Sequence, residues 1–215
     1  MGVGRIAWMG VLVAAMAGAG CHHCPKGDLE RGAAPPKGYE RWCEMKLPSG
    51  EVVRDGTRTV WWDNGRVKKI EEHYRKGKLD GVSTTWHEHG AIFTQQTYVN
   101  GVKDGPFLEN FENGKKWRRG GYHAGKRSGP WIELRPDGTK VDQGTYVDGK
   151  RDGRWVFYRQ EGSPERAMIY HAGVPDGPYV VWWPNGQKRE QGTYAAGRKV
   201  GKTMHWDRLG APAAH

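Results

Sequence analysis

The residues best suited to metal chemistry lie near the start of the chain. Cys21-His22-His23-Cys24 brings together the thiolate and imidazole ligands that zinc prefers. The residues around this run are rich in proline, glycine and alanine and offer no rigid frame. If the sulfur of Cys21 is covalently modified, that residue also cannot supply a thiolate. We therefore expect no metal site here.

The histidines and glycines elsewhere point to no catalytic centre. His87 and His89 would share one face of a strand, but two ligands do not make a metal site. Residues 197–203 are similar to a phosphate-binding loop, but the first glycine lies one residue too close to the lysine. No Ser/His/Asp arrangement stands out, and carboxylates are spread over turns. We expect a non-enzyme that has no cofactor and no small-molecule substrate.

A regular repeat positions most of the distinctive residues. Six tyrosines and six glycines recur every 24 residues: Tyr74, Tyr98, Tyr122, Tyr146, Tyr170 and Tyr194, and Gly77, Gly101, Gly125, Gly149, Gly173 and Gly197. Two further glycine series, which begin at Gly81 and Gly90, keep the same step. Such registered periodicity is typical of repeat proteins.

Each period contains two extended segments and two turns. In one period, Trp131–Leu134 predicts a first strand and Pro136-Asp137-Gly138 a tight turn. Residues 140–146 predict the second strand, and residues 148–153 the return turn. No segment shows sustained helical spacing, so we predict an essentially all-β chain.

Several tyrosines share strand parity with a glycine two residues before them. The pairs are Gly120 with Tyr122, Gly144 with Tyr146, and Gly192 with Tyr194. We expect each glycine to leave room for a neighbouring Trp or Tyr ring. A tyrosine series of this kind is either the packing of the sheet or a platform for a ligand, and cross-strand aromatic pairs favour packing.

The repeat resembles the bacterial MORN variant repeat. The pattern G-x-W-x-x-Y-x-x-N-G, followed by Tyr-x-x-Gly-Lys-x-x-Gly, is matched closely by residues 153–158 and 145–153. The resemblance covers about residues 55–210 and implies an elongated, twisted single sheet of stacked hairpins. About 14 strands spaced about 4.8 Å apart would form a body about 65 Å long. Some bacterial proteins with this repeat are antitoxins, so the resemblance also implies an immunity-type alternative.

The first 20 residues are typical of an export signal. Arg5 is the only charge before the apolar run of residues 6–19, which is short for a bilayer span. The small residues before Cys21 resemble a bacterial lipobox, in which the cysteine is lipidated and becomes the new N-terminus. Gly18 stands where leucine is usual. Cleavage after Ala17-Gly18-Ala19, which would release a soluble periplasmic protein, and a retained anchor stay open.

The lipobox resemblance has two consequences. His22 follows Cys21 in place of the aspartate associated with inner-membrane retention, which implies an outer-membrane lipoprotein facing the periplasm or the surface. With Cys21 lipidated, Cys24 and Cys43 remain, and an oxidising periplasm permits a disulfide between them. It would close a loop of about 19 residues.

These patterns divide the chain into five parts. We expect a signal peptide at residues 1–20, a lipidated N-terminus and flexible linker at 21–38, and an N-terminal cap or degenerate repeat at 39–56. MORN-like repeats follow at 57–210, and a tail at 211–215. Within residues 39–56, Pro48-Ser49-Gly50 and Asp55-Gly56 read as turns.

Charge suggests the class of partner. A basic row of Lys78, Lys126, Lys150 and Arg198 would follow the edge of the sheet that carries the return turns, beside a row of Asp80, Asp104, Asp152 and Asp176. The two rows either compensate each other or contact an anionic lipid or polysaccharide. The net charge of +10 favours anionic partners, and export argues against nucleic acid. We expect a non-catalytic cell-envelope scaffold or binding module for a protein or an anionic polymer, tethered to the membrane by its lipid.

Overall fold

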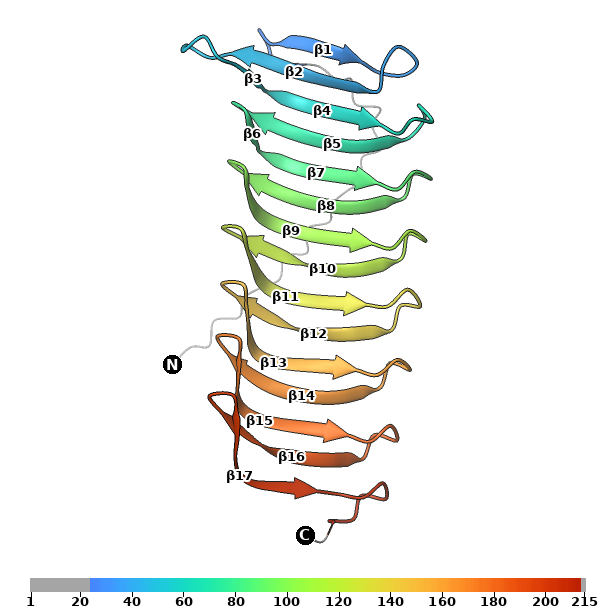
Figure 1. Ribbon diagram of the computed structural model, residues 1–215, viewed down its shortest axis with the longest axis vertical. Helices are drawn as coiled ribbons and strands as arrows, with labels where there is room; N and C mark the ends of the chain where they lie inside the picture. The colour runs from blue at the N-terminus through green and yellow to red at the C-terminus, as the bar shows by residue number, and fades with distance from the viewer. Residues whose placement is uncertain (1–23, 214–215) are drawn as a thin grey trace, which may run out of the picture.

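The computed structural model describes residues 24–213, and all regular elements in that range are β-strands (Figure 1). The predicted signal peptide and the predicted lipidation site Cys21 lie outside the described residues. The described part of the chain contains no helix that is long and apolar enough to cross a membrane.

The strands belong to one sheet. The first are β1 (Leu29–Ala33), β2 (Glu40–Lys46), β3 (Val52–Arg54), β4 (Gly56–Trp61), β5 (Lys68–Arg75), β6 (Lys78–Leu79), β7 (Gly81–Trp86), β8 (Ile92–Val99) and β9 (Val102–Asn110). They are followed by β10 (Lys116–His123), β11 (Lys126–Leu134), β12 (Lys140–Val147), β13 (Lys150–Tyr158), β14 (Pro164–His171), β15 (Val174–Trp182), β16 (Lys188–Ala195) and β17 (Arg198–His205).

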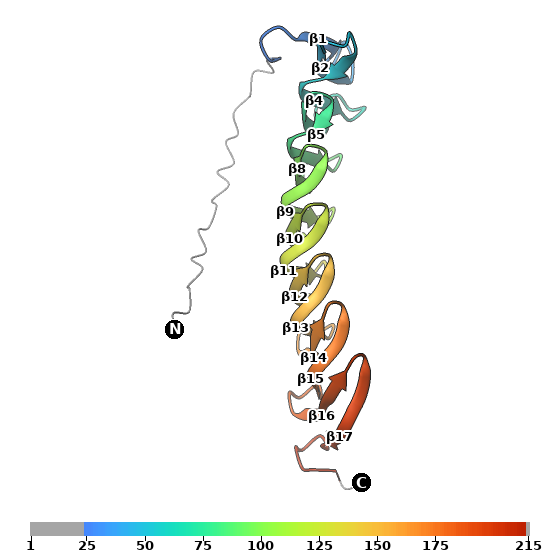
Figure 2. The same cartoon turned by 90° about the vertical axis from the view of Figure 1, so that its left-hand side faces the viewer.

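The sheet is a single antiparallel layer in which neighbours in sequence are neighbours in space. Figure 2 shows that the layer is thin and twisted, as right-handed strand twist requires. The predicted all-β stack of hairpins is therefore confirmed. Residues 24–213 form 17 strands. Within residues 55–210, for which about 14 strands were predicted, there are 14, from β4 to β17, and β1, β2 and β3 precede them.

Two kinds of turn make the stack. At the return turns, a residue and the glycine after it both have positive φ, as Asp148 (50°) and Gly149 (80°) do. This is the geometry of two-residue hairpin turns that match strand twist. At the opposite edge, the turn after β11 is closed by Arg135 N–H donating to the Thr139 carbonyl and by Gly138 N–H donating to the Arg135 carbonyl, both at 2.8 Å.

The return turn is shorter than predicted. Residues 150–153 belong to β13, and Gly153 lies inside the strand with φ of 69°. The pairing register between β12 and β13 shifts between Gln143 and Thr145, on the strand that faces this glycine. Gly153 thus allows β13 to continue through a β-bulge. The strand does not end at this glycine and reaches nine residues.

The N-terminal segment also differs from expectation. Leu29–Ala33, which fell in the predicted linker, forms β1 and pairs with β2, so the linker prediction is wrong for these residues. Asp55-Gly56 is a bend between β3 and β4, both of which pair with β2, and not a chain-reversing turn. Cys24 and Cys43 form the expected disulfide, with Cα atoms 5.5 Å apart, and Cys43 is buried.

The core of this thin sheet is small and aromatic. Its buried apolar residues are Cys43, Trp131, Trp155, Val156, Ala167 and Tyr179. The predicted glycine notches are present: a Cβ on Gly120 would lie 2.2 Å from the Trp131 ring, and one on Gly144 would lie 2.3 Å from the Trp155 ring. Glycine therefore lets a large ring lie against the backbone of the next strand.

Side chains also join successive repeats at both edges. At the return-turn edge, carboxylates accept a backbone N–H from the next return turn: Asp55 from Lys76, Asp80 from Asn100, Asp104 from Ala124 and Asp152 from Ala172. At the opposite edge, Trp62 and Trp183 donate their indole N–H to carbonyls of the next repeat, at Trp86 and Trp206. These bonds fix the offset between repeats.

Candidate functional site

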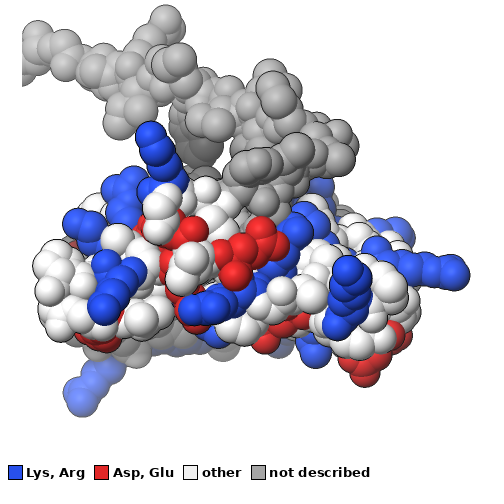
Figure 3. All heavy atoms as spheres, turned by 90° about the horizontal axis from the view of Figure 1, so that it is seen from above, with Lys and Arg blue, Asp and Glu red and all other residues white. Residues whose placement is uncertain are grey.

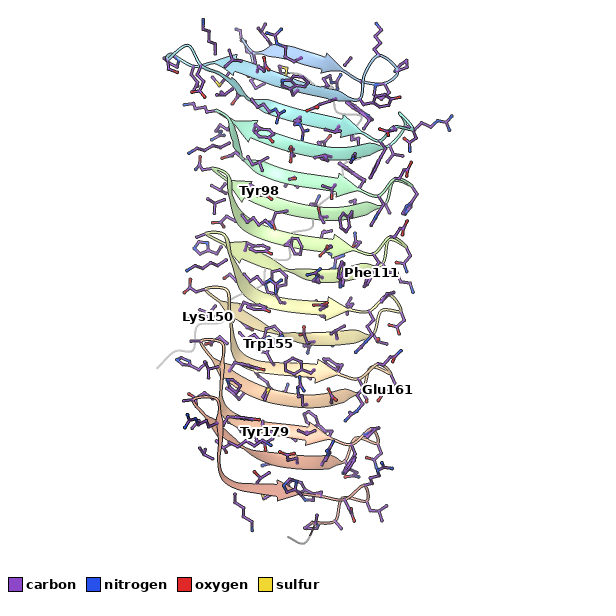
Figure 4. All side chains as sticks on the ribbon, in the orientation of Figure 1. Tyr98, Phe111, Lys150, Trp155, Glu161 and Tyr179 are labelled. Atoms are coloured by element: carbon purple, nitrogen blue, oxygen red, sulfur yellow. A yellow bond between two sulfur atoms is a disulfide. The ribbon has the colours of Figure 1, made fainter. Side chains whose placement is uncertain are left out.

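Each strand of the sheet presents alternate side chains to two faces. We call the face that carries Trp131, Tyr146 and Trp155 the aromatic face, and the face that carries Ile132, Gln143 and Val156 the groove face. In Figure 4, Trp155 and Tyr179 lie over the middle of the strands, Tyr98 and Lys150 lie toward the return-turn edge, and Phe111 and Glu161 lie at the opposite edge.

The predicted tyrosine series packs on the aromatic face. Tyr122, Trp131, Tyr146 and Trp155 follow one another edge to face, with ring centroids 5.5, 5.8 and 5.0 Å apart. Farther along, Tyr194 contacts Tyr179 at 4.9 Å. Such pairs stabilise a sheet beyond the apolar area that they bury. The series is a packing ladder, and its rings are largely occupied by one another.

A row of cations covers the ladder. Lys103 lies over the ring of Tyr122, Arg127 over Tyr146, Arg151 over Tyr170 and Lys199 over Tyr179. Each of these cations stands two residues after a return-turn glycine, one position beyond the basic row predicted from sequence. The sequence signal was present in that spacing, but the predicted row took only the first position. These cations act as cation–π partners of the ladder.

Carboxylates converge at one place on the aromatic face, contrary to expectation. Glu133 and Asp142 lie opposite each other in β11 and β12 and line a hollow of about 80 Å³ with Arg118, Arg127 and Arg151. Burial raises the pKa of Asp142, and Arg151, 3.2 Å away, opposes this by favouring the carboxylate. The hollow is far smaller than a typical ligand pocket, and its side chains are engaged: Asp142 pairs with Arg151, Glu133 accepts from the Trp117 indole, and Arg127 donates to the Tyr146 hydroxyl.

A second charged group binds the last hairpin. Glu190 accepts a hydrogen bond from Lys199 Nζ at 2.6 Å and another from the Tyr179 hydroxyl. Burial alone would raise the pKa of Glu190, but these two hydrogen bonds and the lysine charge lower it below its usual value. Burial and the bond to Glu190 together raise the pKa of Tyr179. The group holds β15, β16 and β17 together.

The predicted basic row is exposed, and its acidic neighbours have structural roles. Lys78, Lys126, Lys150 and Arg198 are all exposed, and Lys126 Nζ lies 3.8 Å from Asp148. Because Asp80, Asp104 and Asp152 accept backbone hydrogen bonds, their charges are fixed beside this row. Charges of both signs are also interspersed at the β1 end of the molecule (Figure 3), where Arg31 contacts Glu44 at 2.9 Å.

The histidines do not come together as a metal site. His87 and His89 stack at 5.5 Å, and His87 also contacts Phe93. His123 and His171 each face an aspartate of the preceding return turn, Asp104 at 3.3 Å and Asp152 at 3.7 Å. Residues 24–213 contain no group of three or more His, Cys, Asp or Glu residues that could hold a metal ion.

The groove face, unlike the aromatic face, has open hollows, and no sequence pattern pointed to them. Three hollows of about 590, 390 and 270 Å³ follow one another along it, from β7 to β16. Aliphatic and proline side chains line them, together with Gln95, Gln143 and Gln191 and with Arg119 and Arg154, and the third hollow also includes Trp182 and Lys188. Central side chains such as Ile132 and Val156 are smaller than the rings of the opposite face, although Trp182 lies in the third hollow.

Comparison with known proteins agrees with this architecture. The family described as MORN repeat variant matches residues 175–196, which span most of β15 and all of β16. No curated protein matches the chain. The matched segment is one copy of the 24-residue unit that recurs along the sheet, with the same return turn and the same hairpin pairing. Residues 175–196 are thus identified as a MORN repeat variant, within a sheet that repeats the same kind of hairpin.

Proposed function

We propose that this MORN-type repeat protein is a non-catalytic scaffold of the cell envelope, held to a membrane by a lipid on Cys21, which binds a protein or an anionic polymer along its sheet. The observation that carries the proposal is that one twisted layer exposes two faces, and that the groove face has open hollows lined by apolar residues. Apolar side chains left uncovered in this way mark interaction surfaces.

The two faces of the sheet have different roles. The aromatic face is filled by its own ladder and cations, so it supports the sheet. The groove face holds three open hollows, which follow one another along the sheet at intervals of about three strands. A partner would therefore make shallow contacts at several places along the sheet. The exposed basic row, with Lys126 and Lys150, supports contact with an anionic polymer as the other form of the same role.

The test is cross-linking in the cells that make the chain, followed by mass spectrometry. We expect a captured envelope component, and an N-terminal peptide that begins at Cys21 and carries an acyl mass. Cys21→Ser should move the protein from the membrane fraction to the soluble fraction. A cytosolic protein that retains residues 1–20 would contradict the proposal. An immunity-type protein would instead capture one toxic protein whose effect on growth it relieves on co-expression.

A further inference from the structure

Two arginines stand at the boundaries between the hollows of the groove face. Arg119 in β10 lines both the first and the second hollow, and Arg154 in β13 lines both the second and the third. Between them lie Pro130, Ile132 and Val156. The face therefore alternates apolar hollows with guanidinium groups.

Neither arginine has a carboxylate partner among residues 24–213. Arg119 makes one long hydrogen bond, 3.5 Å from Nη2 to the Asn110 side-chain oxygen, and its buried Nε has no partner in the described part of the chain. Burial lowers the pKa of Arg119, which reflects the same loss of water. The residue before it, Arg118, points to the aromatic face and pairs with Glu109 at 3.0 Å. A partly desolvated charge without a partner is costly to the fold.

The repeat itself does not need these charges. In other repeats, the position of Arg119 is held by glutamine in Gln95, Gln143 and Gln191, by Ala167 and by Glu71. The position of Arg154 is held by Val82, Pro106, Pro130 and Pro178, and by Lys202 in the last strand. Neutral residues therefore satisfy the fold at both positions. Among the repeats that line the hollows, from β7 to β16, these positions carry a charge only where Arg119 and Arg154 separate one hollow from the next.

We propose that the groove face binds an acidic protein segment, whose apolar side chains enter the hollows and whose carboxylates pair with Arg119 and Arg154. The inference rests on the proposed binding function and names its partner class. The linings favour a peptide, because aliphatic and proline surfaces accept apolar side chains, and the amide of Gln143 and the hydroxyl of Thr145 are suited to a peptide backbone.

The spacing defines the ligand further. Successive hollows are centred about three strands apart, roughly 14 Å. An extended segment covers that distance in about four residues. The fitting segment has an apolar residue at about every fourth position, with an Asp or Glu between two of them.

The test uses a phage-displayed random peptide library selected on the full chain. Selected peptides are then measured against the Arg119→Gln/Arg154→Pro variant, which only restores the residues of neighbouring repeats and should melt at or above the wild-type temperature. The control variant, Lys126→Gln/Lys150→Gln, removes the same charge from the edge of the sheet. Arg119→Glu supplies a second variant, against which peptides with Lys in place of the acidic residue are measured.

We expect enriched peptides that contain Asp or Glu flanked by apolar residues. Their affinity should fall by about tenfold or more for Arg119→Gln/Arg154→Pro, while the edge control stays close to wild type. Arg119→Glu should recover binding to the Lys-substituted peptides. Absence of enrichment, enrichment of uncharged or basic peptides, or equal weakening by the edge control would overturn the proposal.

Two further probes address other ligands. Binding to phosphatidylglycerol vesicles or heparin that is lost with Arg119→Gln/Arg154→Pro, without peptide enrichment, would assign the arginines to a lipid or a polyanion and overturn the peptide assignment. Failure of the peptide assignment can be distinguished from failure of the proposed scaffold function. Capture of an envelope partner in cells that is insensitive to the two arginines would leave the scaffold role standing and remove only the groove as its site.

Discussion

The indole ring of Trp155 lies directly against Gly144 on the neighbouring strand, where a Cβ would fall 2.3 Å from the ring. Trp155 is also among the most deeply buried residues, and its N–H donates to the Thr145 carbonyl at 3.0 Å. The pair shows how a single layer obtains a core: a large ring replaces a second layer, and a missing side chain makes room for it.

Gly144→Ala should therefore destabilise the sheet by about 1–3 kcal/mol, because the added methyl group forces the ring or the strand to move. Urea unfolding followed by tryptophan fluorescence measures the loss. The same substitution in a Trp155→Ala background is the control. Equal cost in both backgrounds would mean that the close contact is not the cause.

Asp80→Ala should loosen the junction between two repeats, because Asp80 accepts the Asn100 N–H at 3.1 Å. We expect a loss of about 1 kcal/mol and faster hydrogen exchange at the Asn100 amide. Asp176→Ala is the matched control, since Asp176 occupies the same row without any such bond in residues 24–213. Similar exchange in the two variants would show that these bonds do not hold the repeats in place.

Loss of the Cys24–Cys43 disulfide should act locally. The bond ties residues before β1 to β2, so the Cys24→Ser/Cys43→Ser variant should lose protection in β1 and β2 first. A loop of this size contributes about 3 kcal/mol in the chain-entropy account. Limited proteolysis should cut near residues 25–39 while β9 to β17 stay intact. Uniform cleavage along the sheet would contradict a local role.

Glu190 should make stability depend on acid pH. Its pKa is lower in the folded state than in the unfolded chain, so the stability that it contributes is present above the unfolded value and is lost as pH falls through the folded one. Glu190→Gln should reduce the fall in unfolding free energy between about pH 6 and pH 3. Denaturant titrations across that range measure it. Glu165→Gln, an exchange on a strand outside this group, should leave the profile unchanged.

Much of this architecture follows from short stretches of sequence. Turn residues act through their own backbone, so Asp148-Gly149, which lies between two strand patterns, predicts a hairpin turn. Strand parity then puts Gly144 and Tyr146 on one face, which was enough to predict the ring notch. The 24-residue period extends each such inference along the chain, and the all-β stack follows from it.

Contacts between repeats depend on information that no short stretch contains. The offset at which hairpins stack decided that Asp80 would accept a hydrogen bond from a turn 20 residues away. It also decided that Glu133 and Asp142 would face each other, and that Leu29–Ala33 would pair with β2. Adjacent Arg118 and Arg119 look alike in sequence, yet only the sheet assigns one to a carboxylate and the other to an open hollow. The physical reason is that turn geometry is local, whereas burial and charge pairing arise only when strands far apart in sequence are laid side by side.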